Sequence, residues 1–221
     1  MLDYSIDIPA NVQDGAPVIV LLHGRGSHKD DLMGLRSGLP FNAIVVTPQG
    51  PFSGAAWGYG GGWAWYQFLG GTMPEPETFL TGQAELEVFM RALPDLLPVT
   101  PGPVILGGFS QGGTSSLAYT LRHPGEIDGL LVFSGFLASH PTVQATPETV
   151  ADTRFFWGHG TVDQMIPIAS ARPGRVALLA AGADLTSRDY PIGHWIEPEE
   201  LRDASEWLTT IFSESITTVV R

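Results

Sequence analysis

Short runs with β-branched residues alternate with helical patterns along this chain, and the alternation constrains its fold more than any other feature. The runs predicted to form strands are Tyr4–Ile8, Val18–Leu22, Ala43–Val46, Val104–Gly108, Gly129–Phe133, Arg154–Trp157 and Leu185–Tyr190. Several of them are apolar throughout, which is typical of strands covered on both faces. Strands that alternate with helices favour an α/β fold with a mainly parallel sheet and helices on both faces. Ligands of such folds bind at the carboxyl ends of the strands.

Helical periodicity is clearest in segments 86–97 and 201–212. Apolar residues recur there at helical spacing, namely Leu86, Phe89, Met90, Leu93, Leu96 and Leu97 in the first segment and Leu201, Ala204, Trp207, Leu208, Ile211 and Phe212 in the second. A further helix is predicted over Thr114–His123. The stretches Pro48–Thr81 and Leu137–Asp152 lack a regular period and are expected to be irregular. Because no linker interrupts the chain, residues 1–221 are predicted to form a single domain.

The composition argues against several classes of function. Lys and Arg number 11 against 23 Asp and Glu, which gives a net charge of −12. Such a chain repels phosphate backbones and anionic lipids, so nucleic-acid binding is not expected. There is no cysteine to form a disulfide, act as a nucleophile or bind a metal. The longest strongly apolar run, Val18–Leu22, is far shorter than the roughly 20 residues of a membrane span.

The remaining global expectations come from what the sequence lacks. The amino-terminal residues Met1–Asp7 contain neither the basic region nor the apolar region of a signal peptide, so we expect a cytoplasmic protein. No P-loop, dinucleotide-binding fingerprint or H-x-x-x-H pair is present, so neither a cofactor nor a metal ion is expected. The oligomeric state stays open, with a homodimer as one option.

The most specific chemical signal is the sequence GGFSQGG at Gly107–Gly113. It follows a predicted strand and precedes a predicted helix, which is the context of a G-x-S-x-G nucleophile elbow. Gly108 and Gly112 leave room for the sharp turn that lifts the Ser110 hydroxyl above the sheet. The amide of Gln111, at the start of the helix, is placed to donate to an oxyanion. We interpret Ser110 as a nucleophile rather than an idle serine in a glycine-rich turn.

A serine nucleophile needs a base and a group that orients the base. His194 lies in a loop after the last predicted strand, and Asp163 follows the strand that ends at Trp157. Both therefore fall at the carboxyl edge of the sheet together with Ser110. The chain order Ser, Asp, His also matches this type of elbow.

Neighbouring titratable residues fit these roles less well. Asp184 and Asp189 lie before or within the last predicted strand, on the wrong edge or too close to His194. His159 is interpreted as a structural residue that shapes the loop of Asp163.

The second oxyanion donor is expected from the loop after an early strand. Val18–Leu22 runs into His23-Gly24-Arg25-Gly26, where the glycines let a backbone amide turn towards the serine. We predict the main-chain N–H of Arg25 as this donor, beside that of Gln111. The side chain of Arg25 is left undecided between solvent and an acidic group of a substrate.

Aromatic residues crowd the stretch 48–81, and they either pack in the core or line a substrate pocket. The two interpretations carry equal weight for the cluster as a whole. The candidates for an acyl or alcohol pocket are Trp65, Tyr66, Met165, Ile166 and Trp195. The last three lie within three positions of Asp163 or His194, which places them near the predicted chemistry.

Taken together, these motifs resemble those of the phospholipase/carboxylesterase family, the α/β-hydrolase group that contains acyl-protein thioesterases and small bacterial carboxylesterases. The matching residues, in chain order, are Leu22-His23-Gly24-x-Gly26, Gly107–Gly113, His159-Gly160-x-x-Asp163, and Gly193-His194 with Glu199-Glu200-Leu201 behind it. The resemblance implies an α/β-hydrolase fold without a large cap domain. It also implies cleavage of esters or thioesters by Ser110, Asp163 and His194, with backbone donors at Arg25 and Gln111.

One departure from the family concerns the substrate loop. The family often has Asp after Trp and an aromatic residue, whereas this chain has Gln67 after Trp65-Tyr66. The difference favours a small ester, aromatic esters included, and we expect a serine carboxylesterase for small to medium carboxylic esters. An acyl thioesterase or lysophospholipase with the same residues is the nearest alternative. A hydrolase-fold binding protein without turnover is another, and a peptidase is disfavoured because nothing indicates a peptide cleft.

Overall fold

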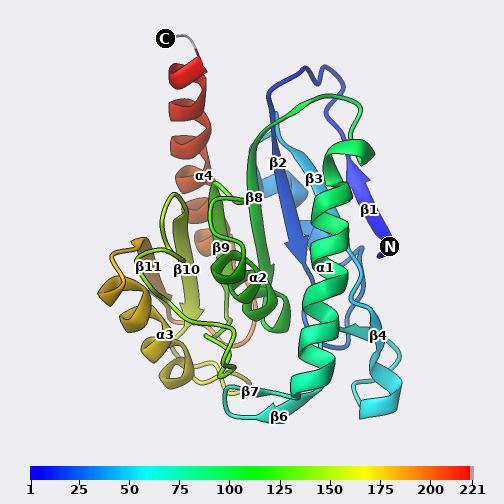
Figure 1. The fold of residues 1–221 in the computed structure, drawn as a ribbon, viewed down its shortest axis with the longest axis vertical. Coiled ribbons are helices and arrows are strands. Elements are labelled where there is room, and N and C mark those ends of the chain that lie inside the picture. Colours follow the sequence, from blue (N-terminus) through cyan, green and yellow to red (C-terminus); the bar gives the residue numbers. More distant parts are fainter. Residues whose placement is uncertain (220–221) are drawn as a thin grey trace.

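The computed structural model describes residues 1–219, the last five of them as backbone only. Its centre is a seven-stranded sheet in the order β1-β3-β2-β8-β9-β10-β11 (Figure 1). These strands are β1 (Tyr4–Asp7), β2 (Ala16–Leu22), β3 (Ile44–Pro48), β8 (Pro101–Phe109), β9 (Gly129–Phe133), β10 (Arg154–Gly160) and β11 (Asp184–Tyr190). Strand β1 is antiparallel to β3, and the other pairings within this sheet are parallel. The predicted mainly parallel sheet is confirmed.

Helices cover both faces of the sheet, as predicted. One face carries α1 (Pro76–Leu96), α2 (Gln111–Arg122) and α3 (Ile168–Ala180), and the other carries α4 (Pro198–Val219) and the 3-10 helix η1 (Leu32–Gly38). Successive side chains of a strand point to opposite faces, which separates two cores. Val18 and Val20 of β2 face the first core, whereas Ile19 faces the second. All three are fully buried, which explains why the strand is apolar throughout.

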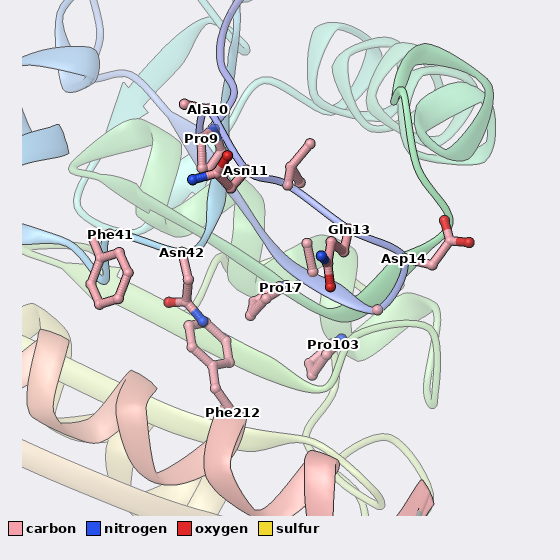
Figure 2. Close-up of a pocket in the computed structure, with 13 residues that line it drawn as sticks. Pro9, Ala10, Asn11, Gln13, Asp14, Pro17, Phe41, Asn42, Pro103 and Phe212 are labelled. Carbon is pink, nitrogen blue, oxygen red and sulfur yellow. The ribbon is translucent and has the colours of Figure 1, made fainter.

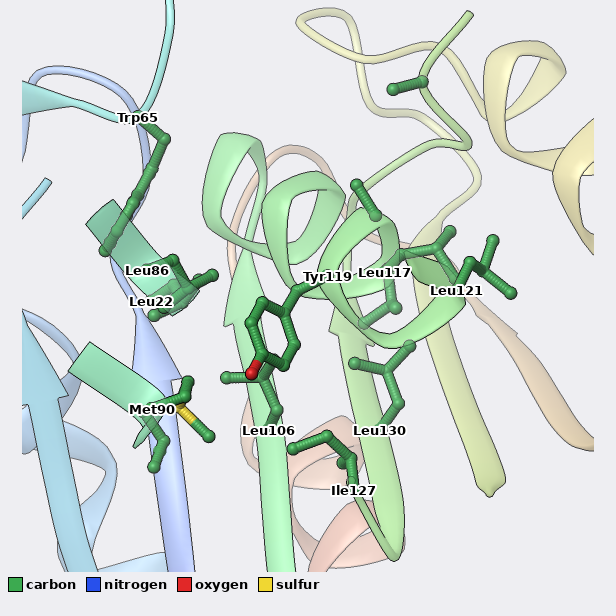
Figure 3. Close-up of a cluster of buried hydrophobic side chains, with 14 of the residues drawn as sticks. Leu22, Trp65, Leu86, Met90, Leu106, Leu117, Tyr119, Leu121, Ile127 and Leu130 are labelled. Atoms are coloured by element: carbon green, nitrogen blue, oxygen red, sulfur yellow. The ribbon is translucent and has the colours of Figure 1, made fainter. Parts of the chain in front are cut away.

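The first core fixes α2 to the strands beneath it. Figure 3 shows Leu106 of β8 and Leu130 of β9 against the α2 side chains Leu117 and Tyr119. These side chains are fully buried, and burial of each leucine contributes roughly 1.5–3 kcal/mol. The Tyr119 hydroxyl remains satisfied because it donates to Glu126 at 2.7 Å. Packing thus sets the position of α2 and of the turn at its amino end.

Helix α1 begins at Pro76, well before the segment 86–97 in which its apolar period is visible. The Glu75 carboxylate caps its first turn by accepting hydrogen bonds from the amides of Glu77 and Thr78. Proline at the first helical position is also favourable, because no intrahelical partner is lost there. Capping therefore extends the helix into a stretch that was expected to be irregular.

The rest of the stretch 48–81 contains short elements. They are β4 (Phe52–Ser53) paired with β5 (Trp63–Ala64), β6 (Phe68–Gly70) paired with β7 (Met73–Pro74), and the 3-10 helix η2 (Gly54–Trp57). Elements of two to four residues are too short to show an apolar period, so the sequence pattern does not predict them. Segment 137–152 contains neither helix nor strand, as predicted.

Helix α3 is absent from the sequence prediction. Pro173 and Gly174 lie inside it, and both residue types are unfavourable in a helix interior. A Cβ at position 174 would lie 2.7 Å from Cβ of Leu137 and 2.9 Å from the Trp157 ring on β10. Close packing on the sheet therefore requires the glycine, and tertiary contacts outweigh the weak intrinsic propensity of this helix.

Within the described part of the chain, the structure shows neither a membrane-spanning helix nor a metal site. No helix within residues 1–219 combines the length and the hydropathy needed to cross a bilayer. In the same residues, no group of three or more His, Asp or Glu side chains is arranged so that it could hold a metal ion.

Candidate active site

A sharp turn between β8 and α2 presents the Ser110 hydroxyl at the carboxyl edge of the sheet. Ser110 has φ 56° and ψ −116°, a strained conformation for a residue other than glycine. A Cβ on Gly108 would lie 2.6 Å from the Leu22 carbonyl oxygen, and one on Gly112 would overlap the same oxygen. Glycine at both positions lets the turn pack against β2. The Ser110 amide donates to the Phe133 carbonyl at 2.8 Å, which fixes the strained residue to β9.

Ser110, His194 and Asp163 form a continuous hydrogen-bonded chain. They follow β8, β11 and β10, whose carboxyl ends meet at one edge of the sheet. Ser110 Oγ lies 2.9 Å from His194 Nε2, and His194 Nδ1 lies 2.7 Å from Asp163 Oδ2. Because a carboxylate oxygen accepts, Nδ1 carries the proton, and Nε2 is left to accept from the serine hydroxyl. The imidazole therefore presents its basic nitrogen to Ser110.

The Asp163 carboxylate is buried, and both of its oxygens are engaged. Oδ1 accepts from the amides of Met165 at 2.9 Å and Ile166 at 2.8 Å, while Oδ2 accepts from His194. His159, also buried, donates from Nε2 to the Ile166 carbonyl at 2.8 Å. Burial lowers the pKa of His159, so its ring is neutral at pH 7. His159 thus holds the loop of Asp163, the structural place that the sequence predicts for it.

The loop that carries His194 packs closely against the end of β10. A Cβ on Gly160 would overlap the Ile192 carbonyl oxygen, so the two loops approach each other through backbone. The Phe109 ring lies on the imidazole, with centroids 4.6 Å apart. These contacts restrict the orientation of His194 and keep its Nε2 directed at Ser110.

His23 orders the loop after β2, residues 23–27, which we call the β2 loop. Its Nδ1 donates to the Gly24 carbonyl at 2.7 Å, and its Nε2 accepts from the Gly50 amide at 2.9 Å. Burial lowers the pKa of His23 to about 4, because a charged imidazole would lose its solvation there. The Gly24 carbonyl and the Arg25 amide belong to one peptide group, so the neutral ring fixes the direction of that amide. In the sequence, His23 is marked only by its place in the His-Gly-x-Gly motif.

The amides of Arg25 and Gln111 come from the two loops that border Ser110. Both residues line the cavity above its hydroxyl. Gln111 begins α2, where the first amides have no acceptor within the helix. No protein acceptor for the Arg25 amide is found within residues 1–219. Amides without a protein acceptor beside a serine hydroxyl can stabilise an oxyanion, which is the role that the sequence predicts for both.

The Gln111 side chain ties the turn at Ser110 to the aromatic stretch. Its Oε1 accepts from the Trp65 amide at 2.8 Å, and its Nε2 donates to the Tyr66 carbonyl at 2.7 Å. The Trp65 indole donates to the His23 carbonyl at 2.9 Å. Trp65 is buried and does not border the cavity. Trp65, predicted as a pocket wall, packs behind the lining of this cavity, because its indole is directed at the backbone of the β2 loop.

A small cavity of about 40 Å³ lies over Ser110. It is lined by Arg25, Tyr66, Phe68, Ser110, Gln111, Phe136, Met165, Ile166 and His194. Of the residues predicted for a substrate pocket, Tyr66, Met165 and Ile166 border this cavity. Trp195 does not border it; its side chain is 55% exposed and packs against Gly193.

Phe68 and Phe136 complete the cavity, and neither is among the predicted pocket residues. Phe68 lies on β6, Phe136 follows β9, and their ring centroids are 6.1 Å apart. The aromatic richness of the stretch 48–81 was a signal for Phe68. No local signal marks Phe136, which reaches the cavity only because β9 lies next to β8.

A larger cavity, of about 600 Å³, lies near the amino ends of β2 and β8. Figure 2 shows the loop that leads into β2, together with Phe41 and Phe212, around it. Its one titratable lining residue within the described chain is Asp14. The cavity has no nucleophile paired with a base, so size alone does not locate the chemistry.

Comparison with known proteins identifies relatives of this chain. Residues 6–212 match the model of the phospholipase/carboxylesterase family. A probable carboxylesterase of rice (Oryza sativa subsp. japonica) is 34% identical over 113 residues, which cover 50% of this chain and 42% of that protein. The chain spans somewhat less than half the length of the first curated relatives that it matches.

Crystal structures show the same architecture. The Bacillus cereus carboxylesterase superimposes with a TM-score of 0.81 at 20% identity, over 96% of this chain and 95% of that one. The Zea mays acyl-protein thioesterase 2 superimposes with a TM-score of 0.77 at 19% identity, over 96% of this chain and 100% of that one. At such identities the likeness shows the fold alone, which is the α/β-hydrolase fold. Since the family model matches nearly the whole sequence, the chain belongs to the phospholipase/carboxylesterase family.

Proposed function

We propose that this chain is a serine carboxylesterase that hydrolyses small carboxylic esters through an acyl-enzyme. The observation that carries the proposal is the hydrogen-bonded chain from Ser110 through His194 to Asp163. Relatives named as carboxylesterases support the reaction class. Each residue then has a defined role. Ser110 is the nucleophile, His194 acts as base and then as acid, and Asp163 orients the base.

In the first half-reaction, Ser110 Oγ attacks the ester carbonyl carbon while His194 Nε2 takes the hydroxyl proton. Asp163 keeps Nδ1 protonated and stabilises the imidazolium that forms. The carbonyl oxygen becomes an oxyanion and accepts hydrogen bonds from the amides of Arg25 and Gln111. His194 then donates its proton to the leaving alcohol, the C–O bond breaks, and the acyl group remains on Ser110.

In the second half-reaction, water replaces the alcohol. His194 Nε2 takes a proton from the water as its oxygen attacks the acyl carbon. The same two amides stabilise the second oxyanion. When the bond to Ser110 Oγ breaks, His194 returns the proton to the serine, and a carboxylic acid leaves.

The cavity over Ser110 favours a short acyl group. Its volume of about 40 Å³ is small against the roughly 300–1,000 Å³ of pockets that enclose drug-sized ligands. Phe68 and Phe136 give it apolar walls. We therefore propose acyl chains of a few carbons as the preferred group.

A series of p-nitrophenyl esters with acyl chains from acetate to dodecanoate tests this proposal. We expect kcat/KM to be highest for the shortest chains and to fall with length, because long chains do not fit the cavity. Ser110→Ala is expected to abolish turnover. A maximum at long chains would contradict the small-ester preference, and undiminished turnover by folded Ser110→Ala would contradict the role of Ser110.

An acyl thioesterase with the same residues is a second candidate. Val162 and Met165, on either side of Asp163, are each 60% exposed, and Trp195 next to His194 is also exposed. Such an apolar rim can hold a long acyl chain outside the small cavity. Oxygen esters and thioesters with the same acyl group separate the two candidates. A strong preference for long-chain thioesters would favour the thioesterase.

A further inference from the structure

The Arg25 guanidinium lies at the rim of the cavity over Ser110. Its Cζ is 4.7 Å from the centre of the Tyr59 ring and 5.5 Å from that of the Phe68 ring. Phe68 and Arg25 both line the cavity. The charge of Arg25 also reaches inside, since burial raises the pKa of Tyr66 and the guanidinium opposes this rise. Two aromatic rings thus position a cation beside the nucleophile.

Arg25 makes no ion pair within the described residues, although the chain carries a net charge of −12. The lysine and arginine residues that do pair with a carboxylate are Lys29, Arg36, Arg91, Arg154, Arg175, Arg188 and Arg202. Contacts with ring faces occupy none of the five N–H donors of a guanidinium. Arg25 can therefore donate to an anionic group that enters the site.

We propose that the Arg25 side chain binds a carboxylate of the substrate, so that the chain acts on short esters with a free carboxylate in their acyl or alcohol half. This inference rests on the proposed esterase function and deepens it. A carboxylate matches the planar fork of a guanidinium and can accept two parallel hydrogen bonds. The single charge of one guanidinium also suits a carboxylate better than the double charge of a phosphate monoester.

The main chain and the side chain of Arg25 have separate roles in this proposal. Substitution removes the guanidinium but keeps the amide that faces the oxyanion. The overall rate can fall because the guanidinium no longer binds the substrate, or because the amide has shifted. The informative quantity is therefore the ratio of kcat/KM between an anionic ester and a neutral ester of the same shape.

Two pairs of esters provide this comparison. Monomethyl succinate and methyl levulinate differ by a carboxylate or a ketone in the acyl half. Acetoxyacetate and acetoxyacetone differ in the same way in the alcohol half. Each pair is measured with the wild type, Arg25→Gln and the control Arg91→Gln. Arg91 is an exposed residue of α1 that pairs with Glu87. It lies about 20 Å along the helix from the helix start at the carboxyl edge. Its substitution therefore removes the same charge far from the cavity.

We expect Arg25→Gln to lower the ratio of carboxylate to ketone about tenfold in one pair, mainly through KM, because a charge-assisted hydrogen bond is lost. The pair that responds identifies the half of the substrate that carries the carboxylate. Intrinsic reactivity cancels, since the same two esters are compared across variants. An unchanged ratio in both pairs, or an equal fall with Arg91→Gln, would overturn the proposal.

Binding to the Ser110→Ala variant keeps the test independent of turnover. Monomethyl succinate and acetoxyacetate are titrated by NMR into Ser110→Ala and into the same variant with Arg25→Gln. We expect Kd to rise about tenfold for one of them when the guanidinium is removed. If the wild type hydrolyses neither these four esters nor p-nitrophenyl acetate, the esterase proposal fails and this titration alone decides. Binding that is absent, or equal in the two variants, would then overturn the carboxylate site.

Discussion

The two edges of the central sheet carry cavities of opposite character. The amino edge has about 600 Å³ of space lined by loop residues, with Asp14 as the titratable group among the described lining. The carboxyl edge has about 40 Å³, yet Ser110, Asp163 and His194 converge there. The contrast teaches that convergent polar groups identify a reactive site better than its volume does.

Strand direction explains this difference. In a parallel sheet the loops after β2, β8, β10 and β11 meet at one edge, so residues distant in sequence come together. That edge also carries a strained serine and the buried rings of His23 and His159. Strain and buried polar groups persist where the surrounding structure holds them in place. At the amino edge, Asp152 before β10 is strained as well, with φ 61°, but it does not line the large cavity.

Removal of the proposed nucleophile gives the largest expected effect and acts on the carboxyl edge alone. Ser110→Ala removes only Oγ, so hydrolysis of p-nitrophenyl acetate should fall by about 10⁴-fold or more. The melting temperature should change little, because the elbow and its packing remain. Initial rates and circular-dichroism melting check both points. A loss of less than tenfold in a folded variant would assign the nucleophile elsewhere.

Gln111→Ala is expected to have the second largest effect. It leaves the Gln111 amide in place but breaks the hydrogen bonds to Trp65 and Tyr66. Misplacement of the oxyanion loops should lower kcat by up to about 100-fold, and the free energy of unfolding should fall by about 1–3 kcal/mol. Gln83→Ala is the matched control, because it removes a buried hydrogen bond to the Ser115 carbonyl away from the cavity. If both variants lost activity equally, activity would simply follow stability.

Glu200 tests whether a buried carboxyl group at the carboxyl edge lowers the stability of the folded state when it ionises. It lies in the first turn of α4, fully buried against Gly158 of β10. Burial, with the nearby charge of Glu197, raises its pKa to about 8. From about pH 4.5, where an unfolded glutamate ionises, to about pH 8, the folded state keeps a proton that the unfolded state has lost. Stability should therefore fall as pH rises through this window, by up to roughly 1.4 kcal/mol per pH unit.

Glu200→Gln removes this titration. Relative to the wild type, the variant should become progressively more stable between pH 5 and pH 8. Urea unfolding at pH 5, 6.5 and 8 measures the difference. A difference that stays constant over the three pH values would show that Glu200 ionises alike in both states.

Much of the carboxyl edge could be predicted from the sequence because its signals are local. The glycines around Ser110 indicate a sharp turn, and the predicted strands before Asp163 and His194 place both residues at strand ends. Strand direction then brings the three together without any knowledge of packing. The predicted sheet and its two covered faces follow from the same predicted strands, several of which are apolar throughout.

The other parts of the site depend on tertiary contacts that no local pattern contains. Phe136 lines the cavity, whereas Trp65 donates a hydrogen bond to a backbone carbonyl. The sequence around an aromatic residue does not distinguish these two positions. Trp195 lies next to His194 in sequence but turns outward against Gly193. Helix α3 was missed for a related reason, since its glycine is needed by the sheet beneath it rather than by the helix.

The smallest effect is expected at the amino edge, and it bears most directly on the comparison of the two edges. Phe41 lines the large cavity and is 85% exposed, so Phe41→Ala should change stability by less than about 0.5 kcal/mol and leave kcat/KM unaltered. Phe68→Ala removes the same ring at the carboxyl edge, where it packs on Phe136 and beside Arg25. We expect it to raise KM for short esters, because the cavity loses one wall. Equal effects on KM would mean that the amino-edge cavity also contacts the substrate, and volume would then matter as much as the convergence of polar groups.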